Sequence, residues 1–160
     1  MNNLLSTQRD KMNARGILLN LIAQKRKVIY GARAINEQLP YSLRKETGDY
    51  DIYTKKPRQI AEELVEKLNK EYRRELFVVI PAKYHKTFKV KDIETGETFA
   101  DFTGTTKKPE SINVMGVRYA KLNYHEKKIK KTLKDMSSAF RHEKDIETLQ
   151  RIKQSKKKLI

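Results

Sequence analysis

The chain has no cysteine among its 160 residues, so it has neither a disulfide framework nor a thiolate metal site. It also lacks any apolar run long enough to span a bilayer. Near the N-terminus, polar and charged residues interrupt the apolar stretch that a signal peptide would need. These absences argue against a membrane-spanning protein and a disulfide-stapled secreted domain, and they predict a cytoplasmic location.

Positive charge is the strongest feature of the composition. Lysine and arginine number 36 against 20 acidic residues, which gives a net charge of +16. The excess is concentrated in residues 121–134 and 151–158. Such an excess attracts phosphate backbones, although anionic lipid, an acidic protein or a generically basic surface are alternatives. Because the charge is uneven, we favour a nucleic acid or another polyanion as partner and no membrane.

The stretch from Thr47 to Tyr53 combines two carboxylates with a strand-like pattern. Asp49 and Asp51 flank Tyr50 just after a glycine, and β-type residues follow. Side chains two apart on a strand share a face, so the two carboxylates would lie side by side and repel each other. A divalent metal would offset this repulsion. The alternative is an Asp-x-Asp pair that arose by chance in a charged loop.

The periodicity predicts one domain of mixed helices and strands. Residues 1–27 form an N-terminal helical arm that either packs on the domain or docks a partner, residues 28–154 form the domain, and residues 155–160 form a basic tail. Helices are expected at 32–39, from Pro57 with a buried stripe of Ile60, Leu64 and Leu68, at 126–136 and at 142–154. Strands are expected at 28–30, 50–53, 76–81, 87–91, 98–102 and 112–119.

The order of these features resembles the nucleotidyltransferase superfamily of polymerase beta type. Gly31 follows an apolar strand, Asp49-Tyr50-Asp51 comes next, and a lone Asp101 stands on a later strand. Residues 117–122, 127–128 and 141–146 look like the strand and paired helices that close such domains. The resemblance runs from about residue 28 to 151, and it is greatest to minimal members from viruses, phages and toxin–antitoxin systems. It implies an α+β (α/β) fold, a mixed sheet flanked by helices, with an N-terminal helix and two C-terminal helices.

The resemblance also implies an activity, the transfer of a nucleoside monophosphate from a nucleoside triphosphate to a hydroxyl of RNA, protein or a small molecule. Asp49, Asp51 and Asp101 would hold Mg²⁺, and Asp101 would help to deprotonate the hydroxyl. The turn at Gly31 and Ala32 would present backbone N–H groups to the phosphates. The charge of the leaving pyrophosphate would be neutralised by basic side chains, namely Arg33, Lys127, Lys128 or Arg141.

Several alternatives stay open beside this resemblance. Ala32 stands where the family usually has glycine or serine, and the gap from Gly31 to Asp49 is longer than usual. The chain could instead be an inactive protein of this fold, a viral structural or nucleic-acid-contacting component in the host cytoplasm or virion. A third possibility is a plain basic nucleic-acid-binding domain.

Single residues have alternative interpretations too. Asp101 could lie on a solvated strand face, Lys127–Lys131 could be a solvated helix face, and Arg141 could belong to a salt-bridge cluster with Lys144 and Asp145. No catalytic role is expected for the three histidines, which are expected at the surface: His85, His125 and His142.

Overall fold

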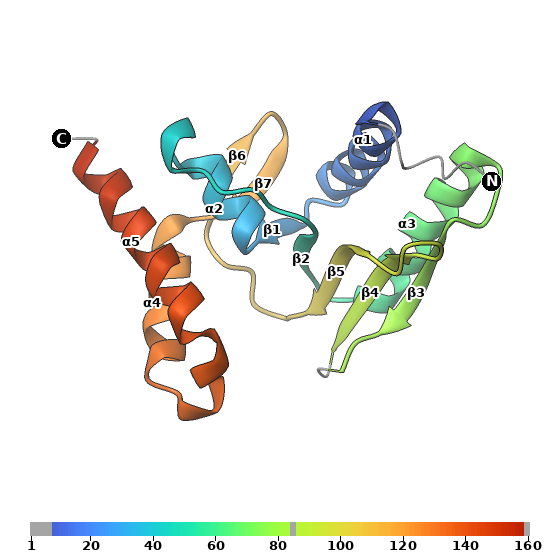
Figure 1. Ribbon diagram of the computed structural model, residues 1–160. Coiled ribbons are helices and arrows are strands. Elements are labelled where there is room, and N and C mark those ends of the chain that lie inside the picture. Colours follow the sequence, from blue (N-terminus) through green and yellow to red (C-terminus); the bar gives the residue numbers. More distant parts are fainter. Residues whose placement is uncertain (1–7, 84–85, 159–160) are drawn as a thin grey trace.

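The computed structural model describes residues 8–83 and 86–158, and within them seven strands form one mixed sheet beside five α-helices (Figure 1). The strands are β1 (Val28–Tyr30), β2 (Tyr50–Thr54), β3 (Phe77–Pro81), β4 (Thr87–Asp92), β5 (Thr98–Gly104), β6 (Ser111–Val114) and β7 (Val117–Ala120). The helices are α1 (Gln8–Gln24), α2 (Ala32–Gln38), α3 (Pro57–Tyr72), α4 (Leu122–Leu133) and α5 (His142–Lys158). The expected mixed fold with an N-terminal helix and two C-terminal helices is confirmed.

The sheet has the strand order β3-β4-β5-β2-β1-β7-β6. Strands β2 and β5 pair in parallel, as do β1 and β7, and the other neighbours are antiparallel. The register places Asp51 opposite Asp101 and Tyr30 opposite Asp51. Directly paired residues project from the same face of a sheet, so these side chains share one face.

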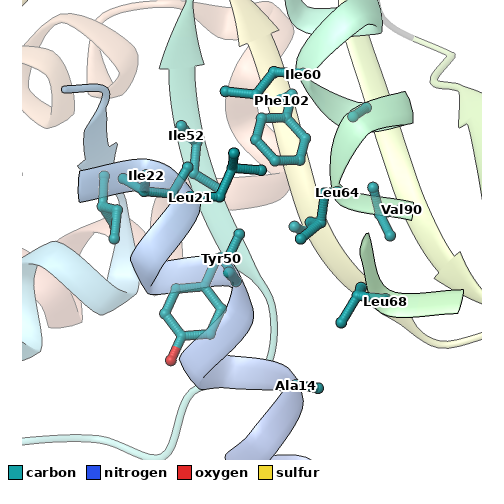
Figure 2. Close-up of a cluster of buried hydrophobic side chains, with 14 of the residues drawn as sticks. Ala14, Leu21, Ile22, Tyr50, Ile52, Ile60, Leu64, Leu68, Val90 and Phe102 are labelled. Atoms are coloured by element: carbon teal, nitrogen blue, oxygen red, sulfur yellow. The ribbon is translucent and has the colours of Figure 1, made fainter. Parts of the chain in front are cut away.

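The opposite face of the sheet carries the main hydrophobic core, which α1 and α3 cover (Figure 2). Strand β2 contributes Tyr50 and Ile52, and β5 contributes Ala100 and Phe102. Helix α1 adds Leu18, Leu21 and Ile22, so this N-terminal helix packs on the domain. Alternation along β2 and β5 therefore separates an apolar face from the face that carries the carboxylates.

Helix α3 begins with Pro57 in its first turn and buries Ile60, Leu64 and Leu68, as the pattern predicts. Its C-terminal end is fixed by Asn69. The Asn69 side-chain oxygen accepts the backbone N–H groups of Leu76 and Phe77, each at 3.0 Å. This contact joins α3 to β3 and holds the edge strand against the core.

The two C-terminal helices pack against each other and against α2. Ile35 of α2 and Leu39, which directly follows α2, meet Ile129 of α4 and Ile152 of α5 in a second, smaller core. Helix α5 continues through Lys158, so residues 155–158 of the expected tail are helical. Figure 1 shows the α4–α5 pair on one side of β2 and β5, with β3 and β4 on the other.

The prediction of a single strand at 112–119 is wrong. The segment is a hairpin of β6 and β7, which pair in antiparallel fashion through Val114 and Val117. Met115 and Gly116 form the turn with φ angles of 52° and 87°. Apolar residues continue on both sides of this short turn, so the alternation in the sequence predicts one strand. Helix α4 also begins four residues earlier than the expected position 126.

None of the helices in the part of the chain that the structure describes has the length and apolar character needed to cross a membrane.

We expect Leu64→Ala to lower the free energy of unfolding by about 2–5 kcal/mol, because the side chain is fully buried between α3 and the sheet. Chemical denaturation measures this loss. The control is Glu66→Ala, an exposed position on the same helix, which should change the free energy by less than about 0.5 kcal/mol. Equal effects of the two variants would contradict the assignment of the core.

Candidate active site

Three aspartates from two strands meet on the polar face of the sheet. Asp51 lies on β2, Asp49 just before it, and Asp101 on the neighbouring strand β5. One carboxylate oxygen from each side chain lies within 4.8 Å of the others. The parallel register of β2 and β5 produces this cluster, since it aligns Asp51 with Asp101. The side chains are thus close enough to share metal ions, while their metal-binding and catalytic roles stay predictions.

The clustering raises the pKa values of two of these carboxyl groups. Burial and the charges of Asp49 and Asp101 raise the pKa of Asp51 to about 7, which Lys128 partly opposes. Burial and contact with Asp101 raise the pKa of Asp49. Bringing like charges together in a partly desolvated place costs free energy. A cation bound between the carboxylates would offset this cost.

Asp101 already has a cationic partner. The Lys89 ammonium on β4 donates to Asp101 Oδ1 at 2.9 Å, across the antiparallel pair of β4 and β5. Asp101 is itself buried, with 8% of its surface exposed. The ion pair holds the Asp101 carboxylate toward the other two.

Gly31 has to be glycine because of Asp51. It turns the chain from β1 into α2 with φ of 76°, a left-handed angle that side chains disfavour. A Cβ atom built on Gly31 would lie only 2.6 Å from Asp51 Oδ2. The glycine therefore serves the close approach of backbone and carboxylate.

His125 on α4 is buried, which corrects the expectation of a surface position. The Gly31 N–H donates to His125 Nε2 at 2.9 Å, while Nδ1 lies 3.0 Å from the Lys121 carbonyl oxygen and donates to it. Burial lowers the pKa of His125 to about 4, so the ring is neutral at neutral pH. The Gly31 N–H, which was expected to bind phosphate, is thus already engaged, and His125 ties the glycine turn to α4.

Lys128 is held beside the carboxylates by aromatic rings. Its Nζ lies 4.7 Å from the ring centroid of Tyr30 and donates to Tyr53 Oη at 3.1 Å. The rings of Tyr30 and Tyr53 stack at 3.7 Å, and Tyr124 Oη lies 2.7 Å from Tyr53 Oη. Cation–π contacts and hydrogen bonds together fix an ammonium group next to Asp51.

A cleft of about 450 Å³ adjoins the carboxylates and runs between α2, the segment before β2 and the α4–α5 pair. Basic side chains line it, namely Lys45, Lys128, Arg141, Lys144 and Arg151. Acidic residues contact two of them. The Lys45 Nζ lies 3.3 Å from Glu147, and Arg141 lies 3.7 Å from Asp145, so the salt bridge foreseen for Arg141 does form.

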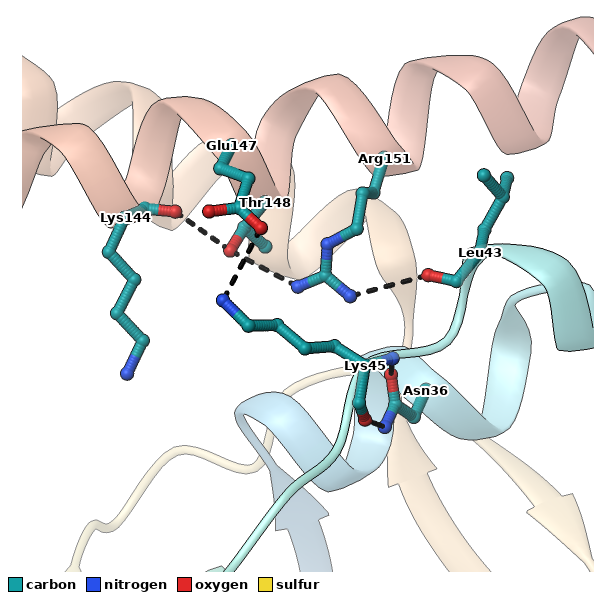
Figure 3. Close-up of polar contacts among 7 residues, drawn as sticks. All are labelled: Asn36, Leu43, Lys45, Lys144, Glu147, Thr148 and Arg151. Carbon is teal, nitrogen blue, oxygen red and sulfur yellow. Dashed lines mark hydrogen bonds and ion pairs between the residues drawn. The ribbon is translucent and has the colours of Figure 1, made fainter.

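Arg151 reaches from α5 across the cleft to the loop before β2 (Figure 3). Its Nη1 donates to the Leu43 carbonyl oxygen at 3.4 Å and its Nη2 to Thr148 Oγ1 at 3.5 Å. The buried Nε has no hydrogen-bond partner. Lys45 on the same loop is fixed by Asn36, whose Oδ1 accepts the Lys45 N–H at 3.0 Å. These contacts hold α5 and the segment before β2 together along the cleft.

The structure brings most of the predicted site residues together. Gly31, Ala32, Lys128 and Arg141 line the cleft beside the carboxylates. Two residues lie elsewhere. The Arg33 guanidinium lies 4.2 Å from the Tyr50 ring centroid and donates to the Gly48 carbonyl, in a separate pocket. Lys127 is exposed and does not line the cleft.

Several residues of the site are not predicted from the sequence. Lys144, Thr148 and Arg151 lie three or four residues apart on one face of α5, and this spacing could have indicated them. Lys89 and His125 gave no such signal, because their roles depend on strand register and on tertiary packing.

No known family model matches the chain, and no match is found among curated proteins. Among solved structures, the Megavirus polyadenylate synthase superposes with a TM-score of 0.78 and 16% identity, over 94% of this chain and 32% of the synthase chain. This chain therefore spans about a third of the synthase. JHP933 from Helicobacter pylori matches with a TM-score of 0.48 and 13% identity, over 83% of this chain and 60% of that protein. The Megavirus likeness shows that the chain has a nucleotidyltransferase-like fold.

We expect Gly31→Ala to destabilise the protein by more than the backbone strain of a left-handed φ, because the added Cβ would also collide with the Asp51 carboxylate. Gly96→Ala is the matched control, because Gly96 has a similar φ of 73° and no atom within 4 Å of the added Cβ. Gly31→Ala should lower the free energy of unfolding by at least about 1 kcal/mol more than the control. Thermal or chemical denaturation measures both, and equal losses would contradict the close approach to Asp51.

We expect Asp51→Asn to stabilise the metal-free protein above neutral pH. The folded-state pKa of Asp51 lies above its ordinary value of 3.8, so its contribution to stability is lost as pH rises from about 4 to about 7. At pH ~8, the variant should gain roughly 1–3 kcal/mol over the parent, and near pH ~4 the two should agree.

Chemical denaturation in a metal chelator across this pH range provides the measurement. Asp92→Asn is the control, since Asp92 faces the opposite side of the sheet and accepts backbone N–H groups that an asparagine oxygen would still accept. A gain for Asp51→Asn that does not depend on pH would contradict the electrostatic explanation.

Proposed function

We propose that the chain is a metal-dependent nucleotidyltransferase that moves a nucleoside monophosphate from a nucleoside triphosphate to a hydroxyl acceptor. One observation carries the proposal. Three carboxylates from β2 and β5 converge within 4.8 Å beside a cleft lined by basic side chains. The first arrangement suits divalent cations and the second suits a triphosphate.

The donor set fits a hard divalent cation such as Mg²⁺. Three carboxylates offer oxygen ligands only, and the raised pKa values of Asp49 and Asp51 mark a site where added positive charge stabilises the protein. Asp49, Asp51 and Asp101 would hold the metal. When bound, Mg²⁺ would supply stabilisation of the negative charge that develops on the attacking and leaving oxygens.

Side chains of the site would carry out the proton transfer and neutralise the charge of the leaving group. Asp101, held by Lys89, accepts the proton of the acceptor hydroxyl. The hydroxyl oxygen then forms a bond to the α-phosphorus. The bond from the α-phosphorus to its bridging oxygen breaks, and pyrophosphate leaves. Lys128 lies next to the carboxylates and Arg141 farther along the cleft, where both would neutralise the charge on the pyrophosphate.

His125 positions the turn on which Asp51 depends. By accepting the Gly31 N–H, it fixes the backbone that lies against the Asp51 carboxylate. Its neutral ring adds no charge to the site.

The structural neighbour supports this function through its fold and adds no detail of substrate or acceptor. The Megavirus protein is named a polyadenylate synthase, and nearly the whole of this chain superposes on a third of it. A shared fold is compatible with shared chemistry, and the activity rests on the site itself.

A second function is favoured by one observation. Ala32 brings no hydroxyl to the turn, and the Gly31 N–H already donates to His125. A chain with fewer phosphate donors could be an inactive protein of this fold, kept as a viral structural or nucleic-acid-contacting component.

We expect Asp49→Asn, Asp51→Asn and Asp101→Asn each to lower the rate of nucleotide transfer at least ~100-fold, because each removes a metal ligand. The assay follows labelled nucleoside triphosphates with Mg²⁺ and RNA, protein or small-molecule hydroxyl acceptors. Asp92→Asn, the same substitution on the other face of the sheet, should keep the parent rate.

A chelator should abolish the transfer. The absence of transfer with any triphosphate, together with no metal-dependent triphosphate binding, would reject the enzyme and favour the inactive protein.

A further inference from the structure

Five basic residues from four separate segments gather at the end of β1 and β2 that lies away from the carboxylates. We call them the distal basic cluster: Arg26, Lys27, Lys55, Lys108 and Arg118. The Lys108 Nζ donates to the Arg26 carbonyl oxygen at 2.7 Å. Burial and the charges of the other four members lower the pKa of Lys108. Strand pairing of Val28 with Tyr53 and with Arg118 brings the segments together.

The cluster has no acidic partner of its own. Within residues 8–83 and 86–158, no ion pair joins any of the five to a carboxylate. Glu110, on the same loop as Lys108, pairs with Lys121 instead. Like charges brought together without counter-charges repel, so the arrangement costs stability unless an anion binds. The five therefore concentrate positive charge that no carboxylate of the described residues neutralises through an ion pair.

One member of the cluster, Arg118, lies on the same face of the sheet as the carboxylates. Tyr119 of β7 faces the core, so its neighbour Arg118 projects from the opposite face, which also carries Asp51. Lys55 directly follows β2 and lies four positions after Asp51 in the sequence. This separation corresponds to ~13 Å along an extended strand.

Polar and aromatic side chains connect the two ends. Thr87 Oγ1 and Thr103 Oγ1 lie 3.0 Å apart, and Tyr30 Oη donates to Thr103 at 3.1 Å. Tyr53 lies on β2 between Asp51 and Lys55 and is half-buried. Beyond Thr87, a hollow of about 650 Å³ is lined by Lys55 and Lys86. A positively charged surface that follows the phosphate backbone is a usual part of a single-strand binding site.

We propose that the distal basic cluster binds the phosphate backbone of a single-stranded nucleic acid whose terminal hydroxyl is the acceptor at Asp101. The role as acceptor rests on the proposed nucleotidyltransferase function, whereas the binding of the strand does not. A strand fits better than a lipid surface, because tyrosine and threonine side chains of neighbouring strands connect the cluster to the carboxylates. A small-molecule acceptor would leave five unpaired cations unexplained.

The test measures binding of a fluorescent single-stranded RNA of about 16 nucleotides, in chelator and in an Asp51→Asn background. The triple variant Lys27→Gln, Lys55→Gln and Lys108→Gln should weaken binding roughly tenfold at low salt. It should also reduce the slope of log affinity against log salt by about 2, since each phosphate contact contributes about 0.7 for single strands.

The matched control removes the same charge from exposed lysines at the C-terminal end of α4, through Lys130→Gln, Lys131→Gln and, directly after the helix, Lys134→Gln. It should retain most of the affinity. Equal losses in the two triple variants would overturn the proposal, because the RNA would then respond only to net charge. Loss of binding to anionic lipid vesicles, with RNA binding unchanged, would overturn it in favour of a membrane.

Transfer to the same RNA separates this proposal from the proposed function. If the parent protein transfers nucleotide and the cluster variant binds and extends the RNA equally well, the cluster assignment is wrong and the enzyme stands. If the cluster variant loses RNA binding and the parent transfers nothing to this RNA, the backbone site stands and the role of the RNA as acceptor is wrong.

Discussion

The repulsion among three gathered carboxylates is the constraint on which the rest of the site depends. Asp49, Asp51 and Asp101 are brought within 4.8 Å by the pairing of β2 with β5, and burial makes their charges more costly. Each neighbouring feature moderates this cost. Lys89 pairs with Asp101, and Lys128 is held beside Asp51 by tyrosine rings. The site thus keeps positive charge near the carboxylates and still has room for a metal ion.

The same constraint explains the contacts of Gly31. The Asp51 carboxylate occupies the space where any larger residue would place its Cβ, so the turn must be glycine. Glycine leaves a turn free to move, and the hydrogen bond from its N–H to His125 limits that freedom. Helix α4 therefore does more than close the domain. Through His125 and Lys128, it fixes both the backbone and the charge beside the carboxylates.

Much of the fold could be predicted from periodicity, because buried stripes and alternation are local properties. Leu64 and Leu68 form the buried stripe that predicts α3, and the alternation in β5 places Asp101 and Phe102 on opposite faces of the sheet. Residues that depend on contacts between distant segments could not be predicted. Lys89 reaches Asp101 only through strand register, and Arg33 turns away because Tyr50 offers it an aromatic ring. The hairpin at Met115 was missed because its turn lies inside an apolar run.

Positive charge lies on two sides of the carboxylates. Cations from α4 and α5 line the cleft on one side of the carboxylates, and the distal basic cluster lies on the other, along β2. A transfer between two phosphate-bearing substrates needs two cationic surfaces that meet at the reacting atoms, because each substrate brings its own negative charge. A single-substrate or purely structural site would need only one. Both cationic surfaces are present beside the carboxylates, which suits the proposed transfer from a nucleotide to a nucleic-acid acceptor.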